Sequence, residues 1–267
     1  MTEIDTSLQL GSELRSFQNI WKGGYFEGNP KDPHGPSSYA AIDVRHGYAD
    51  QADVMSKKGI TAQQIGTISV LYATWLLTLQ GRVKAKTVLE IGPGRGGWTK
   101  AILEEGAEKV YALDALPAEH NQFFEYLGPD LGQRSKYIQV SNFLCAGVPD
   151  DSVDVVFSFG CFCHISRIGV TEYMKSIYLK MREGSEGCIM NSDYAKIASC
   201  LGSAVPADLD REDATPSPGR WYHLGVGWFV ELLSQIGFTI LSEDIGCCPR
   251  DPIVHFAKPV ASSGQLV

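Results

Sequence analysis

The stretch that decides the fold reads TVLEIGPGRGGWTKAI and covers residues 87–102. Its apolar run up to Glu90 and Ile91 predicts a buried strand, and a helix is expected from about Trp98. The glycines between them allow a tight turn and a close approach of the backbone to a ligand. Their spacing is G-x-G-x-G with an acid, Glu90, two positions before the first glycine, and no GK[ST] follows, so a triphosphate P-loop is excluded.

Strands and helices alternate downstream of this turn, which predicts a parallel sheet with crossover helices. The apolar runs are nearly continuous, as expected for a sheet that is covered on both faces. Two final strands should form an antiparallel hairpin that closes the sheet. The expected strands are 87–92, 109–115, 135–140, 153–160, 187–193, 239–246 and 252–259, and the expected helices are about 98–105, 118–126, 170–182 and a last one ending at Gly237.

Polar side chains are expected where the second and third strands end. Asp114 closes the second strand, 24 residues after Glu90. A carboxylate in this place can accept hydrogen bonds from the two hydroxyls of a ribose. Asn142 and Phe143 follow the third strand, so we expect them at the rim of the same cleft, against an adenine edge.

These features together resemble a class I S-adenosylmethionine-dependent methyltransferase. The resemblance rests on the E-x-G-x-G-x-G turn, on Asp114 and on the fourth strand VDVVFSFG, and it covers roughly residues 87–259. It implies a Rossmann-like, seven-stranded, mostly parallel α/β sheet with helices on both faces and an antiparallel last strand. It also implies S-adenosyl-L-methionine as the cofactor, with Glu90, Gly92, Gly94 and Gly96 around its methionine portion and Asp114 at its ribose. The family often has Asp where this chain has Asn142.

The first 80 residues differ in character from the rest. The segment WKGGYFEGNPKDPHGPSSYA is dense in glycine, proline and aromatic residues, which predicts an ordered but irregular segment. Trp21, Tyr25 and Phe26 are expected to fold over the cleft. Residues 62–81 should form a helix at the sheet edge. We therefore expect an N-terminal extension or lid with an edge helix at residues 1–80, and a methyltransferase domain at residues 81–260.

The loop after the fourth strand, FSFGCFCHIS, holds two cysteines and a histidine. Zinc needs about four ligands, and Cys161, Cys163 and His164 supply three only if the backbone folds back on itself, so we predict no metal. Transfer from a sulfonium needs no thiolate nucleophile, but a hydroxyl acceptor must lose its proton. An imidazole suits that role. His164 is therefore the first candidate base, with a capping or packing histidine as the alternative.

Two further candidates lie at the same end of the predicted sheet. Asp193 closes the fifth strand and could orient a base, bind a metal or contact the acceptor. His223 lies in GRWYHLG before the last helix, where it could belong to a lid, with an aromatic surface loop as the alternative. Its neighbours Arg220, Trp221 and Tyr222 would suit a polar, ring-shaped acceptor.

The composition indicates which kinds of partner and which compartment the protein has. The 267 residues carry a formal net charge of −8 without a basic run, so tight electrostatic binding to nucleic acid is disfavoured. No uninterrupted apolar stretch reaches the roughly 18 residues of a membrane span. Seven cysteines without a CxxC pair indicate free thiols in a reducing compartment. We expect a cytoplasmic protein with no membrane partner, and a homodimer remains open.

The sequence predicts a methyltransferase that transfers a methyl group to a hydroxyl of a small molecule. The whole chain is also similar to bacterial methyltransferases found among sugar- and glycan-modifying genes, so a sugar-like acceptor is expected. N-methylation of a small amine remains open because it needs less help from a base. An NAD-linked oxidoreductase on a similar fold and a binding subunit without catalysis are the alternatives from other classes.

Overall fold

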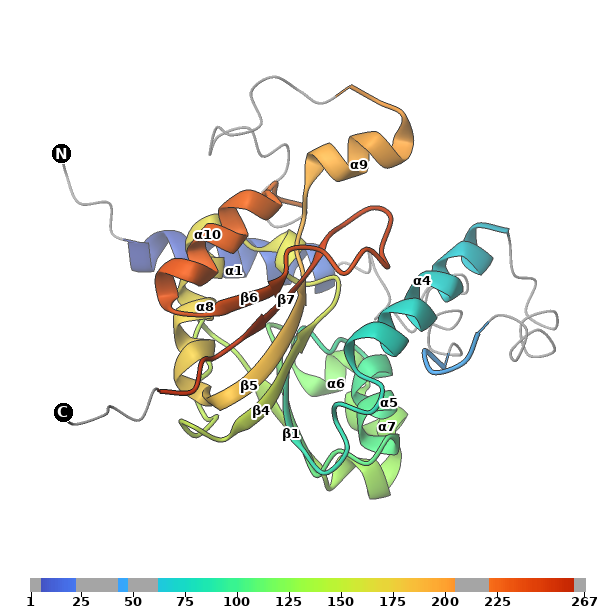
Figure 1. Ribbon diagram of the computed structural model, residues 1–267. Coiled ribbons are helices and arrows are strands. Elements are labelled where there is room, and N and C mark those ends of the chain that lie inside the picture. Colours follow the sequence, from blue (N-terminus) through green and yellow to red (C-terminus); the bar gives the residue numbers. More distant parts are fainter. Residues whose placement is uncertain (1–5, 23–42, 48–61, 205–220, 262–267) are drawn as a thin grey trace, which may run out of the picture.

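A computed structural model gives the fold and describes residues 6–22, 43–47, 62–204 and 221–261. Its centre is a seven-stranded sheet in the order β3-β2-β1-β4-β5-β7-β6 (Figure 1). The strands are β1 (Thr87–Ile91), β2 (Lys109–Asp114), β3 (Ser135–Gln139), β4 (Val153–Ser158), β5 (Met181–Met190), β6 (Thr239–Ser242) and β7 (Ile253–Ala257).

The first five strands pair in parallel, and β7 runs antiparallel to both β5 and β6. The predicted Rossmann-like sheet with an antiparallel last strand is therefore confirmed. Because parallel strands share a direction, the carboxyl ends of β1, β2 and β4 meet at one edge of the sheet. Ligands of open α/β sheets bind at this edge.

Helices cover both faces of the sheet (Figure 1). One layer holds α4, α5, α6 and α7, and the other holds α1, α8 and α10. The helices are α1 (Thr6–Lys22), α4 (Ala62–Thr78), α5 (Gly97–Glu104), α6 (Ala118–Asn121), α7 (Phe123–Gly132), the 3₁₀ turn η1 (Phe162–His164), α8 (Arg167–Lys180), α9 (Tyr194–Leu201) and α10 (Val226–Ile236).

Two hydrophobic clusters lie on the two faces of the sheet. Val88 belongs to the cluster under α4 and α5, whereas its neighbour Leu89 belongs to the cluster under α8 and α10. Successive side chains of a strand point to opposite faces, and both residues are fully buried. This arrangement explains the nearly continuous apolar runs of the sequence.

Several elements differ from the sequence expectation. Helices α1 and α9 were not predicted. The expected helix 118–126 divides at Gln122, which is left-handed with φ of 52°. Strand β5 begins already at Met181, because its pairing with β4 shifts register between Val153 and Val155, and the predicted helix 170–182 therefore ends at Lys180.

Helix α4 was expected at the sheet edge, but it packs on a face. Its Trp75 and Leu79 lie in the same buried cluster as Val88 and Val155. The side chain of Trp21, together with Tyr25, Phe26 and Arg220, lies outside the described residues, so the expected aromatic lid stays a prediction, as does the domain boundary near residue 80. Among the helices that the structure describes, none has the length and apolar character of a membrane span.

Candidate functional site: the carboxyl edge of the sheet

The turn between β1 and α5 is fixed by glycines in the left-handed region. Gly92 has φ of +75°, and a Cβ added there would lie 2.5 Å from the Cβ of Cys161. Gly96 has φ of +101°, and its added Cβ would lie 3.1 Å from the ring of Phe123. An added Cβ at Gly94 would meet nothing within 4 Å. The turn thus packs tightly at its two ends and is open in its middle, where a ligand can approach the backbone.

Asp114 ends β2 beside this turn. Its Oδ2 accepts a hydrogen bond from the Gly94 N–H at 3.1 Å, and its Oδ1 accepts one from the Leu116 N–H at 2.9 Å. The carboxylate is only 8% exposed. Burial raises the pKa of Asp114 to about 6, against these hydrogen bonds, which lower it. The two backbone hydrogen bonds fix the orientation of the carboxylate. Because the carboxylate is buried, further hydrogen bonds from a ligand would stabilise its charged form.

Glu90 lies on β1 and is 1% exposed. Its Oε2 accepts a hydrogen bond of 2.6 Å from the hydroxyl of Thr99 on α5. Burial raises the pKa of Glu90 to about 7, and the nearby charge of Asp114 adds to that rise. Two buried acids at one turn are unfavourable when both are ionised. A cationic or hydrogen-bonding ligand would relieve this cost.

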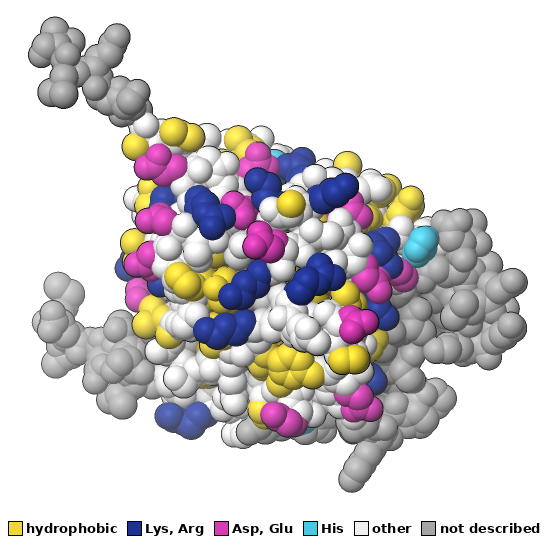
Figure 2. All heavy atoms as spheres, turned by 90° about the horizontal axis from the view of Figure 1, so that it is seen from below, with side chains coloured by type: hydrophobic (Ala, Val, Ile, Leu, Met, Phe, Trp, Pro, Cys, Tyr) yellow, Lys and Arg dark blue, Asp and Glu magenta, His cyan; other side chains and the backbone are white. Residues whose placement is uncertain are grey.

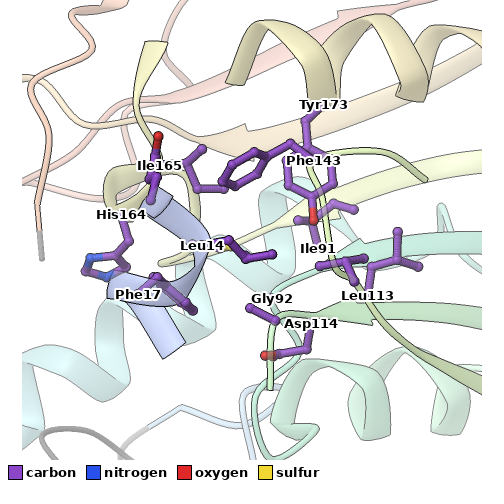
Figure 3. Close-up of a pocket in the computed structure, with 14 residues that line it drawn as sticks. Leu14, Phe17, Ile91, Gly92, Leu113, Asp114, Phe143, His164, Ile165 and Tyr173 are labelled. Carbon is purple, nitrogen blue, oxygen red and sulfur yellow. The ribbon is translucent and has the colours of Figure 1, made fainter. Parts of the chain in front are cut away.

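A cavity of about 40 Å³ lies at the same edge of the sheet (Figure 3). The ends of β1, β2 and β3 form one wall, and the loop after β4, helix α8 and helix α1 form the others. Its lining consists of Glu13, Leu14, Phe17, Ile91, Gly92, Leu113, Asp114, Ala115, Val140, Phe143, Cys161, His164, Ile165 and Tyr173.

Helix α1, which was not predicted as a helix, covers this cavity. Glu13 accepts hydrogen bonds from the backbone N–H and the hydroxyl of Ser166, the residue that caps α8. Gln18 donates to the carbonyl oxygen of Ala115, just beyond β2, at 2.8 Å. Leu14 and Phe17 point toward the cavity between these two contacts (Figure 3). The helical spacing of residues 10, 14, 17 and 21, all apolar, is the signal that could have predicted this helix.

The predicted cofactor residues divide into three groups. Gly92, Asp114 and Phe143 line the cavity. Glu90, Gly94 and Gly96 belong to the adjoining turn. Asn142 is exposed, and its Oδ1 accepts a hydrogen bond from the Leu144 N–H at 3.1 Å, so its side chain shapes the loop after β3. An adenine contact of Asn142 stays a prediction.

His164 lies where the sequence analysis expected it, in the loop after β4. It ends η1 and lines the cavity, and its ring centroid is 6.2 Å from that of Phe17 on α1. Cys161, which precedes η1, packs against Gly92. The loop that carries His164 therefore touches the glycine turn directly.

Asp193 and His223 lie outside the lining of this cavity and are hydrogen-bonded elsewhere. Asp193 caps α9 through Oδ1, which accepts from Ala195 and Lys196, and its Oδ2 accepts from the Val226 N–H at the start of α10. The Nδ1 atom of His223 accepts a hydrogen bond from the Tyr194 N–H at 3.0 Å. A neutral imidazole that accepts at Nδ1 carries its proton on Nε2, so this histidine is placed as a donor.

Of the two cysteines in the loop, Cys163 is buried and Cys161 is half-buried. Burial raises the pKa of Cys161 well above its ordinary value and raises that of Cys163 to about 12. A thiolate nucleophile is therefore unfavourable at either position. Within the described part of the chain, no group of three or more His, Cys, Asp or Glu side chains could hold a metal ion.

Comparison with known proteins identifies the family. A family model described as a methyltransferase domain matches residues 67–208, just over half of the chain. The chain belongs to this methyltransferase family. It is an enzyme that uses S-adenosylmethionine, and the sequence-based expectation of a class I methyltransferase is confirmed. The alternatives of an NAD-linked oxidoreductase and of a binding subunit without catalysis are set aside.

Similar solved structures support the fold. An S-adenosylmethionine-dependent methyltransferase from Mesorhizobium loti superposes with a TM-score of 0.55 at 17% identity, over 69% of this chain and 97% of that one. The 1,6-didemethyltoxoflavin-N1-methyltransferase of Burkholderia thailandensis, with 1,6-didemethyltoxoflavin and S-adenosylhomocysteine bound, gives 0.52 at 18% identity, over 85% and 91%.

One curated relative matches over a short stretch. Ribosomal RNA small subunit methyltransferase A of Cereibacter sphaeroides is 37% identical over 87 residues. The match spans only 30% of this chain and 30% of that enzyme. Its name is therefore no guide to the acceptor of this chain.

The residues at the carboxyl edge fit S-adenosylmethionine. The open backbone at Gly94 is a cradle for a ligand, and the Asp114 carboxylate can accept hydrogen bonds from ribose hydroxyls. When bound, the cofactor supplies a methyl group on a positively charged sulfur. Asp114 and Phe143 would hold its adenosyl part, and Glu90 with Gly92, Gly94 and Gly96 would face its methionine part.

Proposed function

We propose that this enzyme methylates a hydroxyl group of a small, sugar-like molecule, with His164 as the general base. The observation that carries this proposal is the position of His164. Its loop packs against Gly92 through Cys161, and His164 lines the same cavity as Asp114. The histidine therefore belongs to the edge of the sheet where a bound cofactor and an acceptor would meet.

The chemistry of an alcohol acceptor requires such a base. The acceptor oxygen would attack the methyl carbon as the carbon–sulfur bond breaks, and the sulfur would keep the bonding electron pair. The hydroxyl proton would pass to His164. General-base help of this kind contributes typically about 10²–10⁴-fold to a rate.

His164 is preferred over the two other candidates because it lines the cavity, whereas Asp193 and His223 lie outside the lining. Both carboxylate oxygens of Asp193 already accept bonds from backbone N–H groups that begin α9 and α10. His223 uses Nδ1 to accept from the Tyr194 N–H, which leaves a donor and not an acceptor at Nε2. We assign Asp193 to holding the starts of α9 and α10, and His223 to holding the start of α9 through Nδ1.

Aromatic side chains near His223 support a ring-shaped acceptor. The ring of Trp221 lies 5.5 Å from that of Tyr194 and 6.5 Å from that of His223. The N–H of Tyr222 donates to the carbonyl oxygen of Cys163 at 2.8 Å, which ties this segment to the loop of His164. An indole face can stack on the apolar face of a sugar ring.

The surface charge disfavours a nucleic-acid acceptor. The formal net charge is −8, and phosphate backbones are bound mainly by clustered Lys and Arg. On the face drawn in Figure 2, basic and acidic side chains alternate without a broad basic area. A small acceptor fits this net charge better than RNA does.

A second candidate is methylation of a ring nitrogen. It is favoured by the structural similarity to the Burkholderia thailandensis enzyme, which is named as an N1-methyltransferase. Nitrogen nucleophiles need less base assistance than alcohols. The two candidates therefore differ in how strongly turnover depends on His164.

The test starts with a screen of sugars, nucleotide sugars and heteroaromatic amines for transfer of labelled methyl groups. With the acceptor found, His164→Ala is expected to lower kcat by roughly 10²–10⁴ while cofactor affinity stays unchanged. His223→Ala is the matched comparison and should have a smaller effect. If His164→Ala keeps near wild-type kcat on a hydroxyl acceptor, the assignment of the base is wrong.

A further inference from the structure

One polar group in the cavity has no role in the mechanism above, the hydroxyl of Tyr173. This residue lies on α8, is 3% exposed and lines the cavity. In Figure 3 its ring reaches down from α8 and its oxygen points into the cavity, toward Ile91. Asp114 and Gly92 lie on the far side of the same space.

The ring of Tyr173 is held firmly in this direction. It packs edge-on against Phe143, with ring centroids 5.5 Å apart, and in a tilted arrangement against Phe162, with centroids 6.1 Å apart. Phe143 comes from the loop after β3 and Phe162 from η1, so two elements besides α8 fix the ring. A side chain fixed by packing presents its polar atom without further loss of conformational entropy.

The hydroxyl itself is unsatisfied within the protein. Among the residues that the structure describes, none forms a hydrogen bond with it. Tyrosine hydroxyls inside a protein usually find a partner, and this oxygen is not among the fully buried unpaired atoms of the described residues, so it opens onto the cavity. The partner must therefore come from the content of the cavity, which is water in the free protein and a ligand in the complex.

We propose that Tyr173 is a cofactor-binding residue whose hydroxyl donates a hydrogen bond to the adenosyl part of S-adenosylmethionine. The adenosyl part is indicated because Asp114, Val140 and Phe143, at the ends of β2 and β3, line the same cavity. The phenol is suited to donate, since burial raises its pKa well above the ordinary value and keeps the proton in place. The inference rests on the cofactor and is independent of the acceptor.

Tyr173→Phe is the decisive variant, because it removes only the hydroxyl. Calorimetry with S-adenosylhomocysteine is expected to show an affinity about tenfold below that of the wild type, the loss of one hydrogen bond. The melting temperature of the free protein should stay close to that of the wild type, because the hydroxyl opens onto the cavity and makes no hydrogen bond to the described residues. A purely structural tyrosine would instead lose stability without a specific loss of affinity.

Tyr178→Phe is the matched control. Tyr178 lies on the same helix, packs against Phe238 at 4.9 Å between ring centroids and is absent from the cavity lining. Its variant should bind S-adenosylhomocysteine as the wild type does. Equal affinities of Tyr173→Phe and the wild type, within twofold, would overturn the proposal.

Two further measurements locate the contact. The affinity for adenosine alone should also be about tenfold lower in Tyr173→Phe than in the wild type. An unchanged affinity for adenosine would overturn the assignment to the adenosyl part. In protein labelled with 3-fluorotyrosine, the fluorine signal that Tyr173→Phe removes should shift when S-adenosylhomocysteine is added. No shift of that signal would also count against the contact, whatever the stability of the variant.

Discussion

The cavity at the carboxyl edge has two walls of different origin. The first wall contains Gly92 and Asp114 and is part of the sheet, where every strand pairs with its neighbours and the side chains pack in the core. The second wall is α1, which contributes Glu13 and Leu14 and is joined to the first by the contacts of Glu13 with Ser166 and of Gln18 with Ala115. We call the first wall, with Gly92 and Asp114, the fixed wall, because the sheet holds it in place. We call helix α1 the cover, because it packs on the fixed wall from outside the sheet.

The cavity between the two walls is too small to admit the cofactor as it stands. The space between the walls is about 40 Å³, and a water needs roughly 10–15 Å³ of such volume. A nucleoside is many times larger. The fixed wall cannot yield without disrupting the sheet, so the cover has to move. Changes in the first wall should therefore cost stability or affinity, and changes in the second should alter rates.

The largest effect is expected from Gly92→Ala in the fixed wall. The new Cβ would lie 2.5 Å from the Cβ of Cys161, at a φ of +75°. Overpacking together with a strained backbone costs roughly 2–4 kcal/mol of unfolding free energy. Denaturant unfolding measures this loss. Cys161→Gly in the same chain should restore part of it, whereas independent, additive effects would show that the steric account is wrong.

Glu90→Gln should change the pH dependence of stability. Because burial raises the pKa of Glu90 from 4.5 to about 7, the folded state binds the proton more tightly than the unfolded chain does. The contribution of proton binding at Glu90 to the free energy of unfolding is complete below pH 4.5 and is lost as the pH rises through about 7. Glutamine mimics the protonated acid, so the variant should match the wild type near pH 4.5 and exceed it by up to about 3 kcal/mol near pH 8. Parallel pH profiles of the two proteins would contradict this.

Asp114→Ala should lower the affinity for the cofactor more than it lowers the stability of the fold. Hydrogen bonds to a charged acceptor contribute about 1.5–3 kcal/mol, so the affinity for S-adenosylhomocysteine in calorimetry should fall roughly 10–150-fold. Asp130→Ala, at an exposed acid of α7, is the control and should bind normally. An unchanged affinity of Asp114→Ala would remove this carboxylate from the site.

The smallest effect is expected in the cover. Gln18→Ala removes one hydrogen bond between α1 and Ala115, which should ease opening by about 0.5–1.5 kcal/mol. The association rate of S-adenosylhomocysteine, followed by stopped-flow fluorescence, should rise by a factor of about 2–10. Asn19→Ala, on the exposed side of the same helix, should leave the rate unchanged. A wild-type rate in Gln18→Ala would mean that α1 does not limit entry.

The sequence by itself determined the fixed wall. The glycine spacing, the acid at 90 and the acid that ends the second strand predicted the fold, the cofactor and the positions of Gly92 and Asp114, because a strand, a turn and a helix are local features that neighbouring residues specify. It also placed His164 after the fourth strand. Helix boundaries were less certain, since the left-handed Gln122 and the early start of β5 depend on what packs around them.

Only the tertiary structure decided what meets at the cavity. The bond between Glu13 and Ser166 joins residues 153 positions apart, and Gln18 reaches Ala115 across 97 positions. No local pattern announces such contacts. The sequence also did not reveal the role of Asp193. Its position at a strand end predicted a catalytic residue, but its carboxylate accepts hydrogen bonds from the first turns of α9 and α10. Tyr173, too, is an ordinary helix residue in the sequence. Its hydroxyl acquires a direction only because rings from two other elements pack around it.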